Sequence, residues 1–304
     1  MTTDRNDKAG QGHGAAMAHH GELLQGMFVG PQGTPMRGLV TLPCELYSSE
    51  AEFRPRTQPG VEVVPDWKWK AQKAARLTLE YLGTEGVGGE LHMASTIPIG
   101  WGMGSSTSDV IAAIRATATG VGVTLPTEEV ARLAVAAETA SDSIMFGDRA
   151  LLFAQRDALV IEDFGAVFPA FEVLGFSAGR GVDTLSFTPA QYDDREIGRF
   201  EELRALLRDG IRTGDTAVVG YVATASARIN QRFLPKPELD SLLKLVGASG
   251  AVGLQVAHSG SVVGMLFDGN DDDVEVRVEK CRAGLGELGF DQTWRFTTRL
   301  RTPA

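Results

Sequence analysis

The chain has 304 residues, of which 43% are hydrophobic, 22% charged and 7% aromatic, and its formal net charge is −10. This composition is typical of a folded globular protein. The acidity argues against a nucleic-acid partner, because affinity for phosphate backbones comes from concentrated Lys and Arg. No apolar run approaches the roughly 20 residues that a membrane span needs, so we expect no membrane partner.

The length favours two domains. We predict a disordered tail at 1–16, an N-terminal domain at 17–165 and a C-terminal domain at 166–304. The tail mixes charged residues with Gly and Ala and has no apolar stretch, so we expect no secretory signal. Cys44 and Cys281 match neither a metal-ligand nor a disulfide spacing, which fits a reducing cytoplasm.

Periodicity and turn residues predict the elements of the first domain. In chain order these are two strands at 19–29 and 37–55 joined by a turn, a helix at 66–82 and a strand at 88–96. Helices at 108–119 and 126–138 and a hairpin at 150–165 follow. We expect Thr127 to cap the third helix, with two glutamates in its first turn. Lys68, Lys70 and Lys73 are interpreted as a solvated face of the first helix.

The second domain is predicted from the same signals. Its elements are a strand at 171–176, helices at 194–210 and 215–231, a third helix after 237, two strands within 250–267, a helix at 271–284 and a strand at 291–299. This order is typical of a ferredoxin-like split βαβ domain. The fold class is therefore expected to be α+β.

A glycine-rich stretch, PIGWGMGSSTSD at 98–109, joins a predicted strand to a predicted helix. Glycine lets the backbone approach a ligand closely, and the free N–H groups and dipole of a helix N-terminus attract anions. The stretch therefore predicts a phosphate site. It lacks the Lys of a P-loop, the acidic residue of a dinucleotide fingerprint and the G-x-S-x-G of a nucleophile elbow. A glycine-rich turn without a ligand is the alternative.

This stretch resembles the phosphate-binding loop of the GHMP kinases, which include galactokinase, homoserine kinase and mevalonate kinase. That pattern is Pro, three residues, Gly, an apolar residue, Gly, Ser, Ser and Ala, and Thr107 replaces the usual Ala. The resemblance implies ATP as phosphoryl donor and an α/β first domain that carries the loop. The residues that it implies at the nucleotide are Pro98, Gly100, Gly102, Met103, Gly104, Ser105, Ser106 and Thr107.

Two further stretches resemble one branch of that family, the L-threonine kinases associated with cobalamin biosynthesis. HHGELLQG at 19–26 is similar to its substrate-side motif, where other GHMP kinases carry a lysine, and 250–266 is similar to a third motif that packs near the phosphate loop. The residues implied in the substrate pocket are His20, Gly21, Glu22, Gln25, His258 and Ser259. Glu22 and Gln25 are candidates for the ammonium and carboxylate of an amino acid. A structural histidine pair and a turn role for His258 are the alternatives.

Glu138 falls on the inward stripe of its helix, where an ionised carboxylate needs a cation. An arginine could supply it, or Mg²⁺, which prefers oxygen ligands. The resemblance implies that Glu138 and Ser106 bind Mg²⁺, with Ser105 as the nearest substitute. Without the usual lysine, the transferred phosphoryl group must be stabilised by Mg²⁺, by helix N–H groups, by His20, or by a basic residue from elsewhere.

Asp142 lies where many GHMP kinases place an aspartate that accepts the substrate hydroxyl proton. The alternative is a capping or turn residue, because Asp favours such places. Ser106, Glu138 and Asp142 form the expected catalytic set.

The resemblance as a whole implies an ATP-dependent kinase for the side-chain hydroxyl of L-threonine or a related hydroxy amino acid, with the nucleotide between the domains. Two alternatives remain: another acceptor, such as homoserine, a sugar or a secondary-metabolism intermediate, and a nucleotide-binding homologue without turnover. A homodimer is left open.

Overall fold

The computed structural model describes residues 10–179, 190–233, 235–257 and 260–298. The first half of the chain contains β1 (Gly12–Val29), β2 (Pro35–Arg56), β3 (Val61–Val64), α1 (Trp69–Tyr81), β4 (Gly88–Ser95), α2 (Ser105–Gly120), α3 (Thr127–Glu138), a short 3-10 helix (Ser143–Phe146), β5 (Arg149–Ala154) and β6 (Leu159–Val167). The second half contains β7 (Phe171–Ser177), α4 (Asp194–Thr213), α5 (Thr216–Asn230), α6 (Leu239–Ser249), β8 (Gly253–Val256), β9 (Val262–Asp268), α7 (Val274–Glu287) and β10 (Thr293–Thr297).

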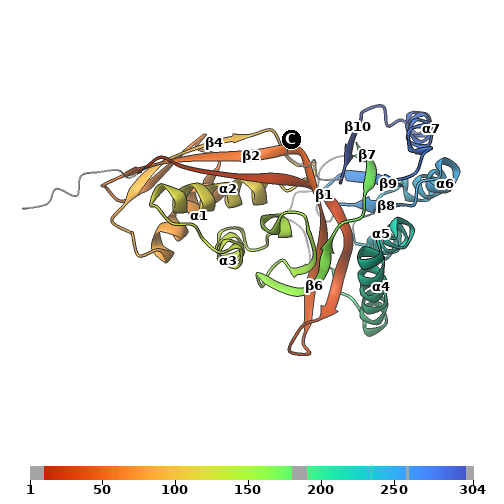
Figure 1. The fold of residues 1–304 in the computed structure, drawn as a ribbon, viewed down its shortest axis with the longest axis horizontal. Helices are drawn as coiled ribbons and strands as arrows, with labels where there is room; N and C mark the ends of the chain where they lie inside the picture. Colours follow the sequence, from red (N-terminus) through yellow and green to blue (C-terminus); the bar gives the residue numbers. More distant parts are fainter. Residues whose placement is uncertain (1–9, 180–189, 234, 258–259, 299–304) are drawn as a thin grey trace, which may run out of the picture.

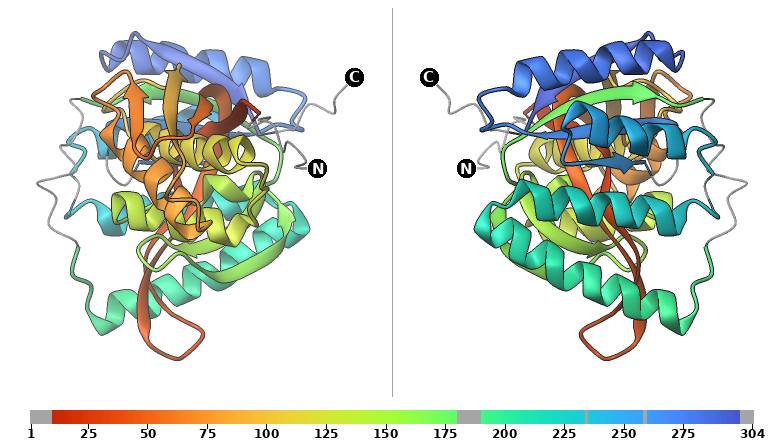
Figure 2. Two further views of the ribbon diagram at one scale, coloured as in Figure 1. Left: turned by 90° about the vertical axis from the view of Figure 1, so that its left-hand side faces the viewer. Right: turned by 90° about the vertical axis from the view of Figure 1, so that its right-hand side faces the viewer.

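Ten strands of the described chain form one sheet in the order β10-β7-β9-β8-β1-β2-β4-β3, with β5 paired to β2 and β6 to β5. The four strands β10, β7, β9 and β8 pair antiparallel. That order and direction are those of a ferredoxin-like split βαβ domain, which confirms the predicted plan of the second half. The β1–β2 hairpin extends at one end of the molecule, and α7 lies at the opposite end (Figures 1 and 2).

Strand β1 connects the two halves of the sheet. It pairs with β2 along its length, and Glu22 pairs with Val256 of β8. The register of β1 shifts three times between Met17 and Leu24. Gly21 has φ +70°, and a Cβ there would lie 2.1 Å from Oε1 of Gln255, so this irregularity requires glycine. The irregular segment brings the predicted substrate motif to the centre of the molecule.

Helices cover the two halves separately. Figure 1 shows α1, α2 and α3 on one side of β1, and α4 and α5 on the other. One apolar cluster nevertheless draws on both halves, and within it Phe28 of β1 lies 5.8 Å from Phe200 of α4 between ring centroids. The proposed boundary at residue 165 falls within β6, so the two-domain division stays a prediction. No helix in the described ranges is long and apolar enough to span a membrane.

The predicted tail at 1–16 was wrong for its last five residues, because β1 begins at Gly12. Gly12 and Gly14 lie directly against α2, where a Cβ on Gly12 would be 2.1 Å from the Ala116 carbonyl oxygen. The small residues that made the segment resemble a tail are what allow this close approach. Residues 1–9 lie outside the described part of the chain.

The predicted cap of α3 was also wrong. Pro126 occupies the N-cap position and Thr127 is the first helical residue, with no side-chain cap hydrogen bond. Proline suits a helix start because its missing N–H would have no intrahelical partner there. Glu128 and Glu129 lie in the first turn, as predicted.

Candidate active site

A cavity of about 720 Å³ opens where the two halves meet. Its walls come from the phosphate loop, the start of α1, the end of α3, the two long strands and the α4–α5 region. Every residue that the resemblance implies at the nucleotide lines it: Pro98, Gly100, Gly102, Met103, Gly104, Ser105, Ser106 and Thr107.

The loop depends on three glycines with positive φ, namely Gly100 (79°), Gly102 (82°) and Gly104 (75°). Gly104 is the N-cap of α2, so the first N–H groups of that helix face the cavity end of the loop. The N–H groups of Ser261 and Val262 donate to the Trp101 carbonyl at 3.0 and 3.1 Å. These hydrogen bonds confirm the predicted contact between the third motif and the loop. His258 and Ser259 lie outside the described residues.

His19 lies directly beneath this loop. Its backbone N–H donates to the Met103 carbonyl at 3.1 Å, and a Cβ on Gly104 would be 2.4 Å from its Cδ2. In the ring, Nδ1 accepts the Gly21 N–H at 3.2 Å, while Nε2 lies 3.0 Å from Oδ2 of Asp142. Because Nδ1 is an acceptor, the proton is on Nε2, which donates to Asp142.

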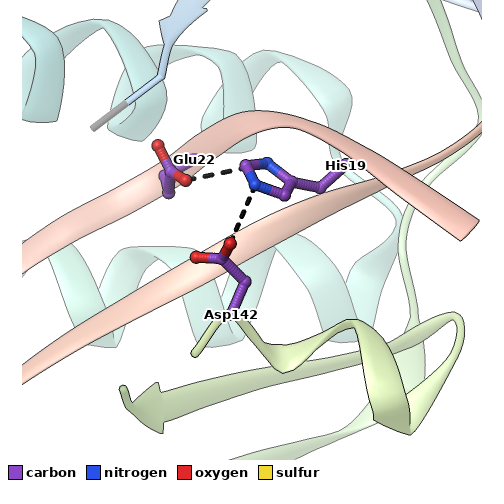
Figure 3. Close-up of side chains that lie close together, drawn as sticks. All are labelled: His19, Glu22 and Asp142. Carbon is purple, nitrogen blue, oxygen red and sulfur yellow. Dashed lines mark ion pairs between the residues drawn. The ribbon is translucent and has the colours of Figure 1, made fainter. Parts of the chain in front are cut away.

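Figure 3 shows the His19 ring between Glu22 and Asp142. The Glu22 carboxylate lies 3.8 Å from Nδ1 and is buried. Within the described residues these three side chains are also the group whose donor atoms could hold a metal. The ring, however, uses Nδ1 to accept from Gly21 and Nε2 to donate to Asp142, so it has no free lone pair to offer.

Asp142 occupies the N-cap position of the 3-10 helix, but its side chain makes no cap hydrogen bond. Its carboxylate is instead directed to His19, and Thr107 Oγ1 donates to Oδ2 at 3.4 Å. The Asp142 side chain therefore does not cap the 3-10 helix.

Glu138 lies beside Asp142, and its side chain, 3% exposed, packs against the start of α2. Its Oε2 accepts from Ser106 Oγ and its Oε1 from Thr107 Oγ1, both at 2.8 Å. Burial raises the pKa of the Glu138 carboxyl to about 7, and the Ser106 and Thr107 hydrogen bonds partly oppose that effect. One carboxylate and one hydroxyl in contact are the oxygen donors that Mg²⁺ prefers, so this pair fits the expected metal.

The cation near Glu138 is Lys70. Its Nζ lies 3.9 Å from Glu138 Oε2 and donates to Ser106 Oγ at 3.1 Å. Lys68 is buried in an ion pair with Asp109, and Lys73 donates to the Ala137 carbonyl at the end of α3 at 3.0 Å. The predicted solvated lysine face was therefore wrong, because α1 packs against α2 and α3 with these side chains between them. One feature of the sequence indicated such a lysine: the motif at 19–26 lacks the lysine that other GHMP kinases carry, so a basic residue from elsewhere was expected.

His20 is not among the residues that line the cavity, and its predicted place in the substrate pocket stays a prediction. It is buried, its ring lies 2.6 Å from the Gln255 side-chain amide, and its Nε2 accepts the Trp294 indole N–H at 2.9 Å. Burial lowers the pKa of His20 to about 3, so the ring is neutral. Trp294 stacks on Trp101, with ring centroids 5.0 Å apart. His20 thus supports the loop from behind, since neighbouring strand residues face opposite ways.

Gly21 and Glu22 are not among the residues that line the cavity either, and their predicted substrate contacts stay a prediction. Gly21 permits the strand irregularity, and Glu22 lies behind His19. Gln25 does line the cavity. It belongs to a second connected group, in which Asn230 Nδ2 donates to the Gln25 carbonyl at 3.0 Å and Tyr192 donates to Asn230 Oδ1 at 2.6 Å. Segments far apart in sequence form this group, and no sequence motif indicated it.

The glycine loop, the start of α2 and the side chains of Glu138 and Asp142 line one cavity, as expected for a small-molecule kinase. The GHMP kinases N terminal domain family matches residues 70–148. The chain is 31% identical over 270 residues to an L-threonine kinase of Citrobacter freundii, covering 84% of this chain and 86% of that protein. It is 29% identical over 286 residues to an L-threonine kinase of Salmonella typhimurium, and this match covers 90% of this chain and 87% of that protein.

The chain therefore belongs to the GHMP kinase family, in its L-threonine kinase-like branch. It is an ATP-dependent phosphotransferase with a hydroxyl acceptor. Solved structures match its fold. A homoserine kinase of Cytophaga hutchinsonii has a TM-score of 0.71 at 16% identity, covering 99% of this chain and 98% of that one. A mevalonate kinase of L. major in complex with R-mevalonate has a TM-score of 0.65 at 17% sequence identity, and the match covers 95% of each of the two chains.

Proposed function

We propose that this kinase phosphorylates the side-chain hydroxyl of L-threonine, or of a closely related hydroxy amino acid, and uses Mg²⁺. The observation that carries the proposal is that one residue of the phosphate loop touches both functional carboxylates. Thr107 Oγ1 donates to Glu138 at 2.8 Å and to Asp142 at 3.4 Å. A hydroxyl held at Asp142 would therefore lie next to a phosphate held at the start of α2. The similarity to two L-threonine kinases supports the choice of acceptor.

The start of α2 and Lys70 would bind the nucleotide phosphates directly, and Glu138 and Ser106 would act on them through a metal ion. Glu138 and Ser106 would hold Mg²⁺, which would neutralise phosphate charge when bound. Lys70 would contact the transferred phosphoryl group, because its ammonium already lies 3.1 Å from Ser106 Oγ. It supplies the charge that other GHMP kinases obtain from the lysine of their N-terminal motif. Phosphoryl transfer needs such positioning and charge neutralisation more than covalent chemistry.

Asp142 would accept the proton of the acceptor hydroxyl. As that proton leaves, the acceptor oxygen forms its bond to the γ-phosphorus, and the bond from the γ-phosphorus to the oxygen of ADP breaks. His19 acts as a positioning residue, since its Nε2–H fixes the orientation of the carboxylate. The Gly21 N–H fixes the ring in turn.

The test is ADP release with ATP and Mg²⁺ across L-threonine, L-serine, L-homoserine and hexoses. We expect the highest kcat/KM for L-threonine. A preference for homoserine or a hexose would contradict the proposed acceptor. ATP binding without turnover on any acceptor would identify a non-catalytic homologue instead.

A further inference from the structure

The cavity contains two connected groups of polar residues, and the proposed chemistry uses only one. The first is built on the start of α2 with Lys70, Glu138 and Asp142. The second consists of Gln25, Arg37, Tyr192 and Asn230, which come from β1, β2, the segment before α4 and the end of α5. Figure 1 shows α4 and α5 on the opposite side of β1 from α1 and α3. The second group thus extends the cavity away from α1, the helix that carries Lys70.

Arg37 is the charged member of the second group. Its guanidinium lies 5.8 Å from the centre of the Tyr192 ring, and one N–H donates to the Ala190 carbonyl. Across the described ranges no carboxylate lies within 4.0 Å of it. Burial lowers the pKa of Arg37, and the nearby charge of Arg156 acts in the same direction. A half-buried guanidinium next to a second one, without a carboxylate, is arranged to receive an anion.

Arg156 connects this anion site to the proposed base. It lies in the turn between β5 and β6 and lines the cavity, and no described carboxylate pairs with it. The carbonyl of its neighbour Gln155 accepts the Ser141 N–H at 2.9 Å, and Ser141 directly precedes Asp142. The turn that carries Arg156 therefore borders the segment of the residue that would hold the acceptor hydroxyl, and Arg37, Arg156 and Asp142 all line the cavity. In a 3-hydroxy amino acid only one carbon separates the carbinol carbon from the carboxylate, so an acceptor held at Asp142 would have its carboxylate close by, within the same cavity.

The nucleotide has its own side of the cavity. The start of α2 and Lys70 provide for its phosphates, and Trp67 and Trp69 line the cavity near α1 with 55% of each residue exposed. Exposed aromatic rings at that position suit a purine base, which stacks on them. Arg37 comes from β2 instead, next to Gln25 and Tyr192.

We propose that Arg37, assisted by Arg156, binds the carboxylate of the acceptor and selects amino acids over neutral alcohols. This inference rests on the proposed function, because it assumes an acceptor with a carboxylate. A guanidinium forms paired, charge-assisted hydrogen bonds with a carboxylate, which a neutral alcohol cannot replace.

The experiment compares L-threonine with 1-amino-2-propanol, which has the same amine and hydroxyl but no carboxylate. The variant is Arg37→Met, and the control is Arg54→Met on the same strand, where the arginine is exposed outside the cavity. In Arg37→Met we expect the KM for L-threonine to rise roughly 10- to 100-fold, the range for losing a charged hydrogen-bond partner. The KM for ATP should stay the same. The kinetic constants for 1-amino-2-propanol should be the same in Arg37→Met as in the wild type, because this acceptor has no carboxylate. Arg54→Met should behave as the wild type.

A second readout does not depend on turnover. Calorimetry measures L-threonine binding to protein saturated with Mg²⁺ and a non-hydrolysable ATP analogue, and Arg37→Met should weaken it by the same factor. If Arg37→Met does not fold, Arg156→Met, at an exposed turn, should raise the KM for L-threonine by a smaller factor.

Three results would overturn the inference while leaving the proposed function intact: an unchanged KM for L-threonine, an equal loss on 1-amino-2-propanol, or a raised KM for ATP alone. Failure of the proposed function is recognised separately, in the wild type, by absence of turnover with L-threonine. If the wild type uses a different carboxylate acceptor, the same variants on that acceptor decide the inference. If it uses only neutral acceptors, the inference is wrong as well.

Discussion

His19 Nε2 donates to Asp142 Oδ2 at 3.0 Å directly beneath the phosphate loop. The pair joins the substrate-side strand β1 to the segment that follows α3. Because Gly21 fixes the other ring nitrogen, the histidine can hold the carboxylate in one orientation. This pair is the point where the motif at 19–26 and the motif around Glu138 act together.

Replacing His19 by Asn should lower kcat roughly 10-fold or more, because the shorter side chain cannot reach Asp142. The KM for ATP should change little. His19→Gln places an N–H at a similar reach and should restore part of the rate, which a packing role alone would not produce. Steady-state kinetics on both variants test this, and equal rates for Asn and Gln would contradict the positioning role.

Replacing Asp142 by Asn should lower kcat roughly 10²-fold or more, the usual order for a positioned acid–base group. The melting temperature should change little, because the asparagine keeps one side-chain oxygen as acceptor for His19 and the Asp142 side chain makes no cap hydrogen bond. Kinetics and thermal unfolding are measured on the same preparation. A variant that keeps its rate but melts several degrees lower would instead support a capping role.

Replacing Glu138 by Gln should abolish most turnover while the fold survives, because the change is nearly isosteric. The amide keeps an acceptor for one hydroxyl but loses the charge that would bind Mg²⁺. Titrating Mg²⁺ in the kinase assay measures the effect. Wild-type kinetics at saturating Mg²⁺ would show that Glu138 is not the metal ligand.

Replacing Lys70 by Met should lower kcat roughly 10²-fold, because the ammonium beside Ser106 would no longer reach the phosphates. Lys73→Met is the matched control on the same helix, since the Lys73 ammonium donates to the Ala137 carbonyl and does not line the cavity. The control should keep its activity and lose a little stability. Equal activity losses in the two variants would point to a distortion of α1.

The buried histidine makes stability depend on pH. The pKa of His20 is about 3 in the folded protein and 6.5 ordinarily, so between these values only the unfolded chain binds the proton. The free energy of unfolding should therefore fall as pH drops below 6.5, by up to about 1.4 kcal/mol per pH unit from this group.

Urea unfolding of the wild type and His20→Asn at pH 7 and pH 5 isolates this contribution, because the other groups titrate alike in both proteins. The stability advantage of the wild type should be smaller at pH 5. A constant difference would show that His20 stays accessible to protons in the folded state.

Local patterns in the sequence determined most elements and the phosphate loop. The apolar spacing of α3 and the Val-rich strands β8 and β9 are properties of short segments, so each predicts its own conformation. The loop at 98–109 is equally local, because glycines at fixed spacing before a helix supply the anion site themselves. The residues that the family resemblance implied at the nucleotide therefore come together along one cavity.

The tertiary structure alone decided which side chains face that cavity. Alternation along β1 makes His19 and His20 face opposite ways, but only packing decides that His19 faces Asp142 in the cavity and His20 faces Trp294. Lys70 reaches Ser106 because α1 packs on α2, and Arg37 meets Tyr192 across distant segments. Side-chain direction depends on strand irregularities and on packing between segments that are far apart in the chain. No local pattern in a single sequence contains that information.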